Sequence, residues 1–417
     1  MSQNARSALR HRDFTLLLVA TVMEAFALQM SFVAIGWQVY SIRGKALDLG
    51  LLGLAEFLPL LILALPAGQL ADRVPRRHLL TVMMLLNLVV LSGLLGVTIA
   101  DTNVVWPFFA LAFVQGIGSA IGAPAGRALT PSLVPEEILV SALAQRSIAF
   151  GLSSIVAPAI GGILFAIDQE LVYAVGLVLA GAALACVLAL RSGRLPATEG
   201  EGAAGIDEVL AGIRLIRRTN VLLGAISLDL FAVLFGGAVA LLPIFAKDVL
   251  EVGPTGLGLL RASPAVGSLV AAGIMARYPI RRRAGPMLFG VVAGFGVSMV
   301  VFGLSRQMWL SMLALAVGAG LDMVSVVLRQ TILPLVTPDE LRGRVNAVEM
   351  VFISASNELG AFESGVAAAL IGAVPAVLVG GVVTVVVAGA WWKLFPALAR
   401  VDRLDELRPV AVEPVVS

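Results

Sequence analysis

Long apolar stretches run through almost the whole chain and are separated by short polar or charged segments. The stretches do not show the strict alternation of apolar and polar positions that a barrel strand needs. A transmembrane helix needs about 20 predominantly apolar residues. The pattern therefore predicts twelve membrane-spanning helices. We expect them at residues 14–40, 49–71, 79–100, 104–126, 141–167, 171–190, 220–246, 255–276, 286–305, 308–333, 346–372 and 374–395.

The composition agrees with a protein whose main body lies in a membrane. Of the 417 residues, 59% are apolar and 13% are charged, whereas soluble domains hold about 25% charged residues. A water-soluble fold of this length cannot bury so much apolar surface, so the excess must face lipid. This excludes a soluble enzyme or a nucleic-acid-binding protein as the main body. The predicted fold class is an all-α integral membrane protein.

Positive charges are distributed unevenly between the predicted loops. With a cytoplasmic N-terminus, inner loops and helix ends hold 24 of the 29 Lys and Arg residues, and outer loops hold four. The outer four are Arg43, Lys45, Lys247 and Arg306. This bias follows the positive-inside rule and predicts two cytoplasmic termini in the cell (inner) membrane. The polar N-terminal segment runs into an apolar stretch without a cleavage site, which indicates a retained first helix.

The two halves of the chain share a repeated pattern at an offset of about 205 residues. Residues 67–77 align with 272–282, and residues 135–138 align with 338–341. The repeat predicts two related six-helix halves. We place the N-terminal half at 1–190, a cytoplasmic linker at 191–219, the C-terminal half at 220–395 and a cytoplasmic tail at 396–417. Apolar residues on one face of 206–218 favour a short surface helix in the linker.

One inner loop resembles a family signature. Residues 68–77 resemble the major facilitator loop signature G-x-x-x-D-R-x-G-R-R, with Pro75 in place of the second glycine. Residues 133–137 and 153–162 are similar to the branch that contains the enterobactin exporter, the macrolide efflux proteins and the transmembrane secretion effectors. The resemblance covers the whole chain. It implies twelve helices in two pseudo-symmetric halves, with a substrate site between the halves near the middle of the bilayer.

The loop signature implies a gate at the cytoplasmic end. In the family, the aspartate pairs with arginines and a helix end to latch the outward-open state, and here Asp72 has that position. Arg127 is the partner that fits. The other gating-loop residues are Gly68, Arg73, Arg76 and Arg77. The alternative is that these arginines only follow the positive-inside rule.

The fifth predicted span contains small residues around a proline and resembles the antiporter signature G-x-x-x-G-P-x-x-G-G. The matching positions are Ser153, Ala157, Pro158, Gly161 and Gly162. Small residues and a proline let a neighbouring helix approach closely. The resemblance implies export by antiport. The exporter signature R-x-x-Q-G is half present in the fourth span, where Ala112 replaces the arginine before Gln115 and Gly116.

Acidic residues at repeat-related depths are the candidates for ion coupling. Glu24 lies about ten residues into the first span, Asp229 lies equally deep in the seventh, and the two are 205 residues apart. A central ionisable residue costs about 2.5–3.5 kcal/mol to insert, so such residues usually face a cavity or a partner. We expect this pair to couple transport to protons or another cation. The alternative is an interhelical network that neutralises the charges without a role in transport.

Other charges inside the predicted spans are candidates for the same cavity. Glu56 and Arg261 are also 205 residues apart, and each is followed three residues later by a proline. This pair is expected to contact substrate or to form an outer gate. Asp322 lies near the middle of the tenth span, and Glu349 and Glu363 belong to a polar stripe of the eleventh.

The favoured function is a proton-coupled antiporter that exports a small amphiphilic molecule, such as a drug-like compound or a siderophore, by alternating access. Uptake or lipid flipping by the same fold, and a non-transporting membrane sensor, are the alternatives. The chain has no Walker loop, one cysteine and two histidines 67 residues apart, so we expect no enzyme, cofactor or metal site. The expected partners are the substrate, protons and the lipid bilayer, with no nucleic acid and a monomeric chain.

Overall fold

The structure of the chain is a computed structural model that describes residues 8–191, 206–280 and 282–409. Within these ranges, several side chains lie outside the described part: those of residues 64–65, 67–69, 71–73, 206–211, 347, 354 and 406. Every regular element in the described ranges is a helix or a helical turn. The chain forms two compact units.

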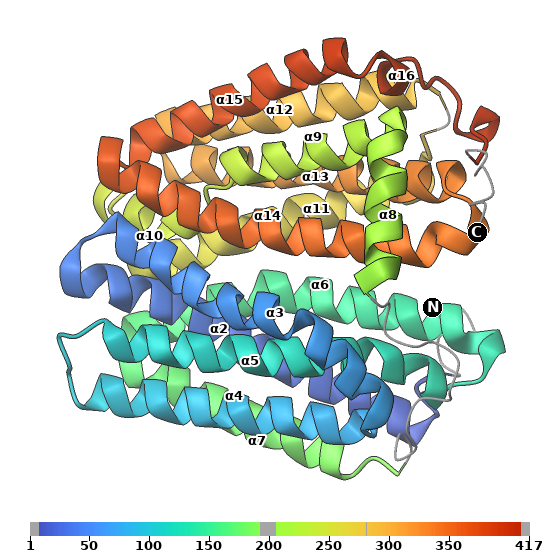
Figure 1. Cartoon of the computed structure of the whole chain (residues 1–417). Helices are drawn as coiled ribbons and strands as arrows, with labels where there is room; N and C mark the ends of the chain where they lie inside the picture. Colours follow the sequence, from blue (N-terminus) through green and yellow to red (C-terminus); the bar gives the residue numbers. More distant parts are fainter. Residues whose placement is uncertain (1–7, 192–205, 281, 410–417) are drawn as a thin grey trace. The chain divides into compact units, whose positions relative to one another are not determined.

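The first unit contains Met1–Ala203 and Leu242–Ala262. Six long helices of this unit lie side by side (Figure 1). They are α2 (Arg12–Arg43), α3 (Ala46–Arg73), α4 (Arg76–Ile99), α5 (Trp106–Leu129), α6 (Glu136–Ile167) and α7 (Gln169–Leu188). α2 packs against α6 and α7, and α5 packs against α3 and α4. An apolar core that includes Phe14, Leu80 and Leu129 fills one end of the unit.

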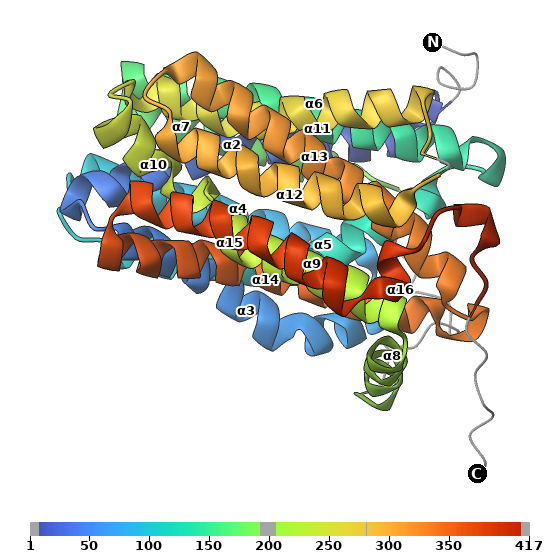
Figure 2. The same cartoon turned by 90° about the horizontal axis from the view of Figure 1, so that it is seen from above.

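The second unit contains Ala204–Leu241 and Ser263–Ser417. Its helices are α8 (Ile206–Arg218), α9 (Asn220–Gly236), α12 (Ala284–Leu304), α13 (Met308–Val336), α14 (Arg342–Ile371), α15 (Ala373–Leu394) and α16 (Pro396–Ala399). α12 packs against α13 and α15 (Figure 2). α9 packs against α14 and α15. α11 (Gly253–Arg277) begins in the first unit and ends in the second.

These helices confirm the predicted twelve-helix membrane fold. Among the described residues, 11 helical segments are long and apolar enough to cross a membrane. The twelfth helix is α14, which is 30 residues long and carries two arginines and three glutamates. The predicted ends agree to within a few residues; the span expected at 14–40, for example, is the helix Arg12–Arg43. The boundaries of the two six-helix halves stay a prediction.

The seventh predicted span, 220–246, is interrupted. α9 ends at Gly236, and Gly237 has extended backbone angles (φ −77°, ψ 102°). A 3₁₀ turn (Val239–Leu241), α10 (Leu242–Ile244) and a π-helical turn, η3 (Phe245–Val249), follow. Two adjacent glycines weaken a helix because they lose the most backbone entropy on ordering. The predicted span is present as one candidate membrane-crossing segment, Asn220–Val249, but its helix is interrupted after Gly236.

α8 occupies the residues for which the sequence predicts a surface helix. It runs across the ends of α9 and α14, which belong to the same unit (Figure 1). The side chain of Ile216 is buried. A Cβ atom at Gly212 would lie 3.0 Å from the carbonyl oxygen of Arg344, so α8 packs closely on α14. The role of α8 as a membrane-surface helix stays a prediction.

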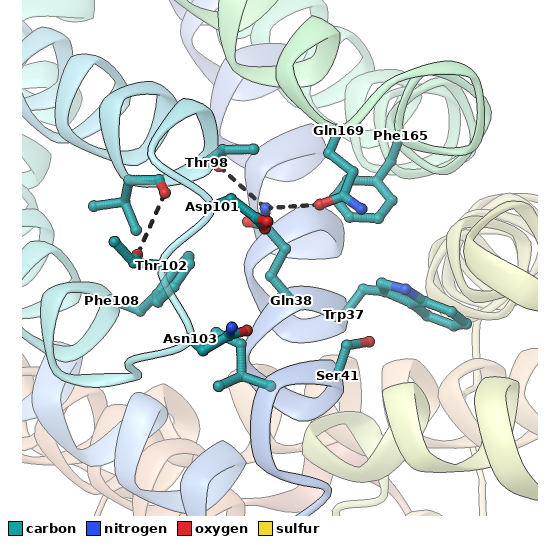
Figure 3. Close-up of a pocket in the computed structure, with 12 residues that line it drawn as sticks. Trp37, Gln38, Ser41, Thr98, Asp101, Thr102, Asn103, Phe108, Phe165 and Gln169 are labelled. Atoms are coloured by element: carbon teal, nitrogen blue, oxygen red, sulfur yellow. Dashed lines mark hydrogen bonds between the residues drawn. The ribbon is translucent and has the colours of Figure 1, made fainter.

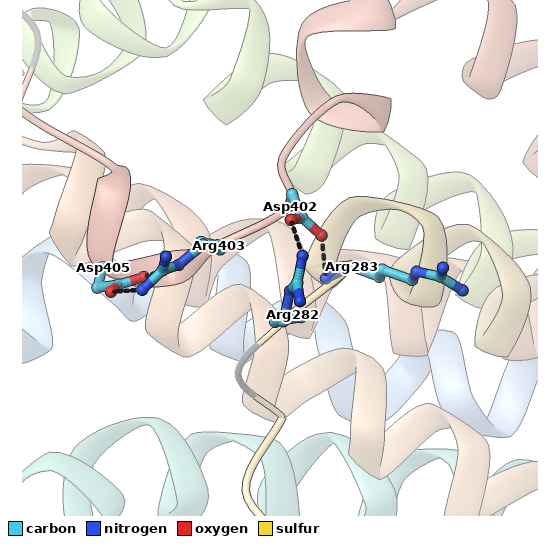
Figure 4. Close-up of polar contacts among 5 residues, drawn as sticks. All are labelled: Arg282, Arg283, Asp402, Arg403 and Asp405. Atoms are coloured by element: carbon cyan, nitrogen blue, oxygen red, sulfur yellow. Dashed lines mark hydrogen bonds and ion pairs between the residues drawn. The ribbon is translucent and has the colours of Figure 1, made fainter.

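The segment after α15 folds back onto the start of α12. The Asp402 carboxylate accepts a hydrogen bond of 2.9 Å from the backbone N–H of Arg283 and lies 3.5 Å from the Arg282 guanidinium (Figure 4). A carboxylate is stabilised at this helix N-terminus, where backbone N–H groups are unpaired. A hydrogen bond from Arg403 lowers the pKa of Asp405 beside it. Residues 410–417 of the predicted tail lie outside the described residues.

Candidate functional site

A buried arginine joins three helices of the second unit. Arg329 in α13 is 2% exposed. Its guanidinium lies 2.7 Å from the carboxylate of Asp229 in α9 and 3.6 Å from that of Glu349 in α14. Asp322 lies two turns earlier on the same face of α13 and interacts electrostatically with Arg329 and Asp229. We name these four residues the ion cluster. It brings together three carboxylates that the sequence singled out.

The ion cluster holds three acidic groups and one basic group. Taking an ion out of water costs several kcal/mol, and a partner offsets this cost only in good geometry. Arg329 meets that condition with Asp229, whereas its contact with Glu349 is almost 1 Å longer. A cluster of this composition can therefore take up or release a proton while the Arg329–Asp229 pair stays intact.

Sequence reasoning missed the role of Arg329 because it counted this residue among the cytoplasmic charges at helix ends. Arg329 lies seven residues before the end of α13 and is buried, so it is not a solvent-exposed charge at the helix end. A signal was present in the sequence: residue 329 falls inside the predicted span 308–333. A basic residue within an apolar span needs a carboxylate partner, and three candidates were already known.

Glu24 has a different environment, although the repeat relates it to Asp229. Glu24 in α2 is 6% exposed, and the side-chain amide of Asn87 in α4 donates a hydrogen bond to one of its oxygens. The other carboxylate oxygen has no hydrogen-bond partner in the described part of the chain. In the same part of the chain, no ion pair involves Glu24, whereas Asp229 has Arg329. Glu24 belongs to the first unit and Asp229 to the second.

Glu24, Ser31 and Gln38 are spaced by seven residues along α2 and form a polar stripe on one face of this helix. The Gln38 amide donates to Thr98 of α4 at 3.0 Å, and its oxygen accepts a hydrogen bond of 2.6 Å from the Tyr173 hydroxyl of α7. The stripe therefore faces α4 and α7 within its own unit.

The remaining cavity candidates lie on α11, α3 and α14. Arg261 lies in the first turns of α11, and its guanidinium stacks over the Phe32 ring of α2, 5.3 Å from the ring centre. The backbone carbonyl of Glu56 in α3 is so close to Gly116 that a Cβ atom there would lie 2.0 Å from it. Glu363 is half-buried in α14, four turns after Glu349. Whether Glu56 and Arg261 act as a pair stays a prediction.

Arginines of the predicted gating loop bond to helix ends. Arg76 donates to the carbonyl oxygen of Ala128 near the end of α5 at 2.8 Å, and Arg77 donates to that of Leu188 at the end of α7. Cations stabilise these carbonyl-rich helix ends. Arg127, the expected partner of Asp72, is exposed. The side chains at the other predicted positions, Gly68, Asp72 and Arg73, lie outside the described part.

The antiporter-like motif of α6 is a close-packing surface in the first unit. Ala157 is fully buried, and the Ser153 hydroxyl donates to the Ala149 carbonyl. A Cβ atom at Gly161 would lie 2.7 Å from Met30 of α2. At Gly162 it would lie 2.5 Å from the Pro254 carbonyl oxygen of α11. Pro158 lies on the same surface, because a Cβ atom at Gly258 of α11 would be 2.4 Å from its carbonyl oxygen.

The whole chain is similar to known membrane transporters. The profile of the transmembrane secretion effector family matches residues 3–414. The multidrug efflux pump Tap of Mycolicibacterium fortuitum is 28% identical over 375 residues, which cover 84% of this chain and 88% of that protein. The enterobactin exporter EntS of Escherichia coli is 26% identical over 348 residues, which cover 81% of each.

Solved transporter structures share the fold. A bacterial homolog of the human lysosomal transporter Spinster, in an inward-facing and unoccupied conformation, has a TM-score of 0.72 at 14% identity and covers 95% of this chain and 98% of its own. The nucleoside transporter NupG has a TM-score of 0.64 at 13% identity, with 92% and 99% covered. Identities this low show the fold alone. Together with the family match over nearly the whole length, the fold shows a multi-pass membrane transporter of the major facilitator type. The chain belongs to the transmembrane secretion effector family of the major facilitator superfamily.

Proposed function

We propose that this transporter is a proton-coupled antiporter that exports a small amphiphilic molecule by alternating access. The names of its relatives support export, since one is an enterobactin exporter and another a multidrug efflux pump. Drug-like compounds and siderophores are therefore the first substrates to test. We place the protein in the cell (inner) membrane with both termini in the cytoplasm, and as a monomer.

The observation that carries proton coupling is the isolation of Glu24. A buried carboxylate is costly when it is charged and lacks a cation. The described contacts of Glu24 include a neutral amide, from Asn87, and no cation. Binding a proton removes the buried charge, and losing it requires either water or a change in the surroundings. A carrier that exposes Glu24 to water in one state and buries it in another would therefore bind and release a proton in each cycle.

The ion cluster contains a second buried acidic group, Asp229, whose negative charge is compensated by Arg329. Because Arg329 pairs with Asp229, we assign Asp229 to holding the arginine in position. Asp322 and Glu349 are then the groups in the second unit whose proton occupancy is free to change. This division of roles goes beyond the symmetric pair that the repeat predicted.

Contacts around the end of α2 support a gate that the predicted topology places at the outer face. The segment Leu242–Ala262 packs with the first unit, although it follows α9 of the second. The Tyr40 hydroxyl donates to the Asp248 carboxylate, and the Lys247 ammonium donates to the Ser41 hydroxyl at 3.1 Å. We propose that these contacts hold the outer end of the pathway closed and that Gly236 and Gly237 form the hinge for its opening.

The test is transport into everted membrane vesicles that are acidic inside. A gradient of one pH unit is worth about 1.4 kcal/mol per proton, so a one-proton antiporter accumulates its substrate about tenfold. We expect at least one member of a panel of siderophores and drugs to accumulate and to release protons from the vesicles. Glu24→Gln is expected to abolish accumulation while it retains gradient-independent exchange of labelled for unlabelled substrate.

The matched control is Glu170→Gln, which removes an exposed carboxylate from the first turn of α7 and is expected to behave like the unmodified protein. Accumulation driven by the opposite gradient would indicate uptake instead of export. Full gradient-driven accumulation by Glu24→Gln would remove this residue from coupling. If no panel compound moved protons, the non-transporting alternative would be favoured.

A further inference from the structure

A cavity of about 200 Å³ lies in the first unit, where α2 and α4 end and α7 begins. Figure 3 shows Gln38 at its centre, with Asp101 and Asn103 on the loop that joins α4 to α5. The cavity has room for about six or seven water molecules at roughly 30 Å³ each. Gln38 lies 14 residues after Glu24 on a continuous helix, which places the cavity about 21 Å from the coupling candidate.

The floor of the cavity is rigid and uncharged. The Gln38 amide oxygen accepts from Tyr173, and its nitrogen donates to Thr98 at 3.0 Å and towards Gln169 at 3.4 Å. Thr98 in turn donates to the Leu94 carbonyl at 2.8 Å. Because these polar groups already have partners, the floor is fixed in shape before a ligand arrives. A ligand therefore loses little affinity to ordering this part of the site.

Aromatic side chains line part of the cavity. Phe108 and Phe165 are buried, and Trp37 contributes its indole ring. The Lys247 ammonium lies 5.9 Å from the centre of the Trp37 ring, so this ring already has a cation of the chain beside it, and Phe108 and Phe165 are the rings left for a ligand. Aromatic faces bind ammonium groups through their negative electrostatic potential. These walls suit a ligand with an apolar group next to a positive charge.

The rim of the cavity carries one negative charge. Asp101 is the single acidic residue among the twelve lining residues, and none of the twelve is basic. Within the described ranges, the Asp101 carboxylate has no ion-pair partner. Its backbone is held in the left-handed region (φ 46°) and donates a hydrogen bond of 3.1 Å to the Thr98 carbonyl. Asp tolerates this conformation better than most residues, and Asn does so equally.

From these features we infer that the cavity is a binding site for a small organic cation, a primary or quaternary ammonium that carries one aromatic or short alkyl group. The Asp101 carboxylate pairs with the ammonium at the rim, and Phe108 and Phe165 contact the apolar group. The site lies wholly within one unit, so it does not depend on the proposed antiport cycle. A cation bound in this cavity would lie next to the hydrogen bonds that join Tyr40 to Asp248 and Lys247 to Ser41.

The test is equilibrium binding of benzyltrimethylammonium to the purified full-length protein. For a ligand of about ten non-hydrogen atoms, we expect a dissociation constant in the millimolar range. Neutral benzyl alcohol and anionic benzoate are expected to bind at least about tenfold more weakly, because they lack the charge that pairs with Asp101. Asp101→Asn keeps the backbone conformation and is expected to weaken binding of the cation by about tenfold.

A matched control and a second variant keep the inference falsifiable. Glu170→Gln removes an exposed carboxylate from the first turn of α7, next to the cavity but not lining it, and is expected to leave binding within about twofold. Asn103→Lys puts a competing ammonium on the exposed rim and is expected to abolish binding. Equal binding of benzyl alcohol, unchanged binding by Asp101→Asn, or equal losses from Asp101→Asn and Glu170→Gln would each overturn the inference.

Discussion

At the scale of single residues, the ion cluster predicts that the arginine matters more than any one acid. Arg329→Met leaves Asp229 and Glu349 buried without their cation. Breaking a buried pair in this way costs about 3–5 kcal/mol, because the remaining charge is uncompensated. Asp229→Asn keeps a hydrogen-bond acceptor and leaves Glu349 as a counter-charge, so it should cost less. The measurement is the thermal unfolding midpoint of the purified protein in detergent.

Two further variants make this comparison specific. Arg218→Met is the same substitution at an exposed position on α8 and is expected to leave the midpoint nearly unchanged. The double variant Arg329→Met/Asp229→Asn should be more stable than the sum of the single losses implies, because the two residues contact each other. An Arg329→Met protein that melts with the control would show that the ion cluster does not stabilise the fold.

At the scale of secondary-structure elements, the contact between α6 and α11 predicts which glycines cannot be replaced. A Cβ atom at Gly258 would lie 2.4 Å from a backbone oxygen, that of Pro158, so a helix must move. Overpacking of this kind costs about 1–3 kcal/mol. Gly273 is in the same helix with open space around it. We expect Gly258→Ala to lower the unfolding midpoint, and Gly273→Ala to leave it unchanged or raise it, since alanine favours a helix by up to about 1 kcal/mol.

If both alanine variants lowered the midpoint equally, the loss of stability would be a general effect of replacing a glycine in α11. The specific contact of the antiporter-like motif would then carry no stability. If only Gly258→Ala lowered the midpoint, the contact would be shown to stabilise the fold. Measuring the transport activity of Gly258→Ala on the same preparation would then tell whether the contact also matters for export.

The positions of the helices could be predicted from the sequence, whereas the side-chain contacts between helices could not. Apolar length and charge placed every long helix, since both are properties of a single segment. The interruption after Gly236 was visible as a glycine pair, but apolar length alone did not separate a kinked span from a straight one. The partner of Arg329 depends on how α9, α13 and α14 are rotated about their axes. That rotation is set by side-chain packing between segments about 100 residues apart, which no local pattern encodes.

At the scale of the whole molecule, the chain crosses between the two compact units at both ends of the segment Leu242–Ala262. The chain passes from the second unit to the first between Leu241 and Leu242 and returns between Ala262 and Ser263. The first crossing follows the Gly236–Gly237 break, and the second lies one residue before Pro264 in α11. Glycine pairs and prolines are where helices bend. If Leu242–Ala262 is the gate, as proposed above, we expect its motion to be absorbed by bending at these two places.

This arrangement predicts that weakening one hydrogen bond exposes the gate segment. Tyr40→Phe removes the bond to Asp248, which is worth about 0.5–1.5 kcal/mol at a partly exposed site. Opening of Leu242–Ala262 should then become about two- to twelvefold more frequent. Ala246 is fully buried in this segment, so Ala246→Cys, in a Cys186→Ser background, reports opening through its rate of reaction with a membrane-impermeant maleimide. With the predicted topology, the increase in labelling rate is expected in intact cells, where the reagent reaches the outer face.

The control is Tyr278→Phe, which changes an exposed tyrosine of the second unit and should leave the labelling rate unchanged. Equal rates in the two tyrosine variants would mean that the Tyr40–Asp248 contact does not hold the gate closed, and a faster reaction in everted vesicles instead would reverse the assignment of the outer face.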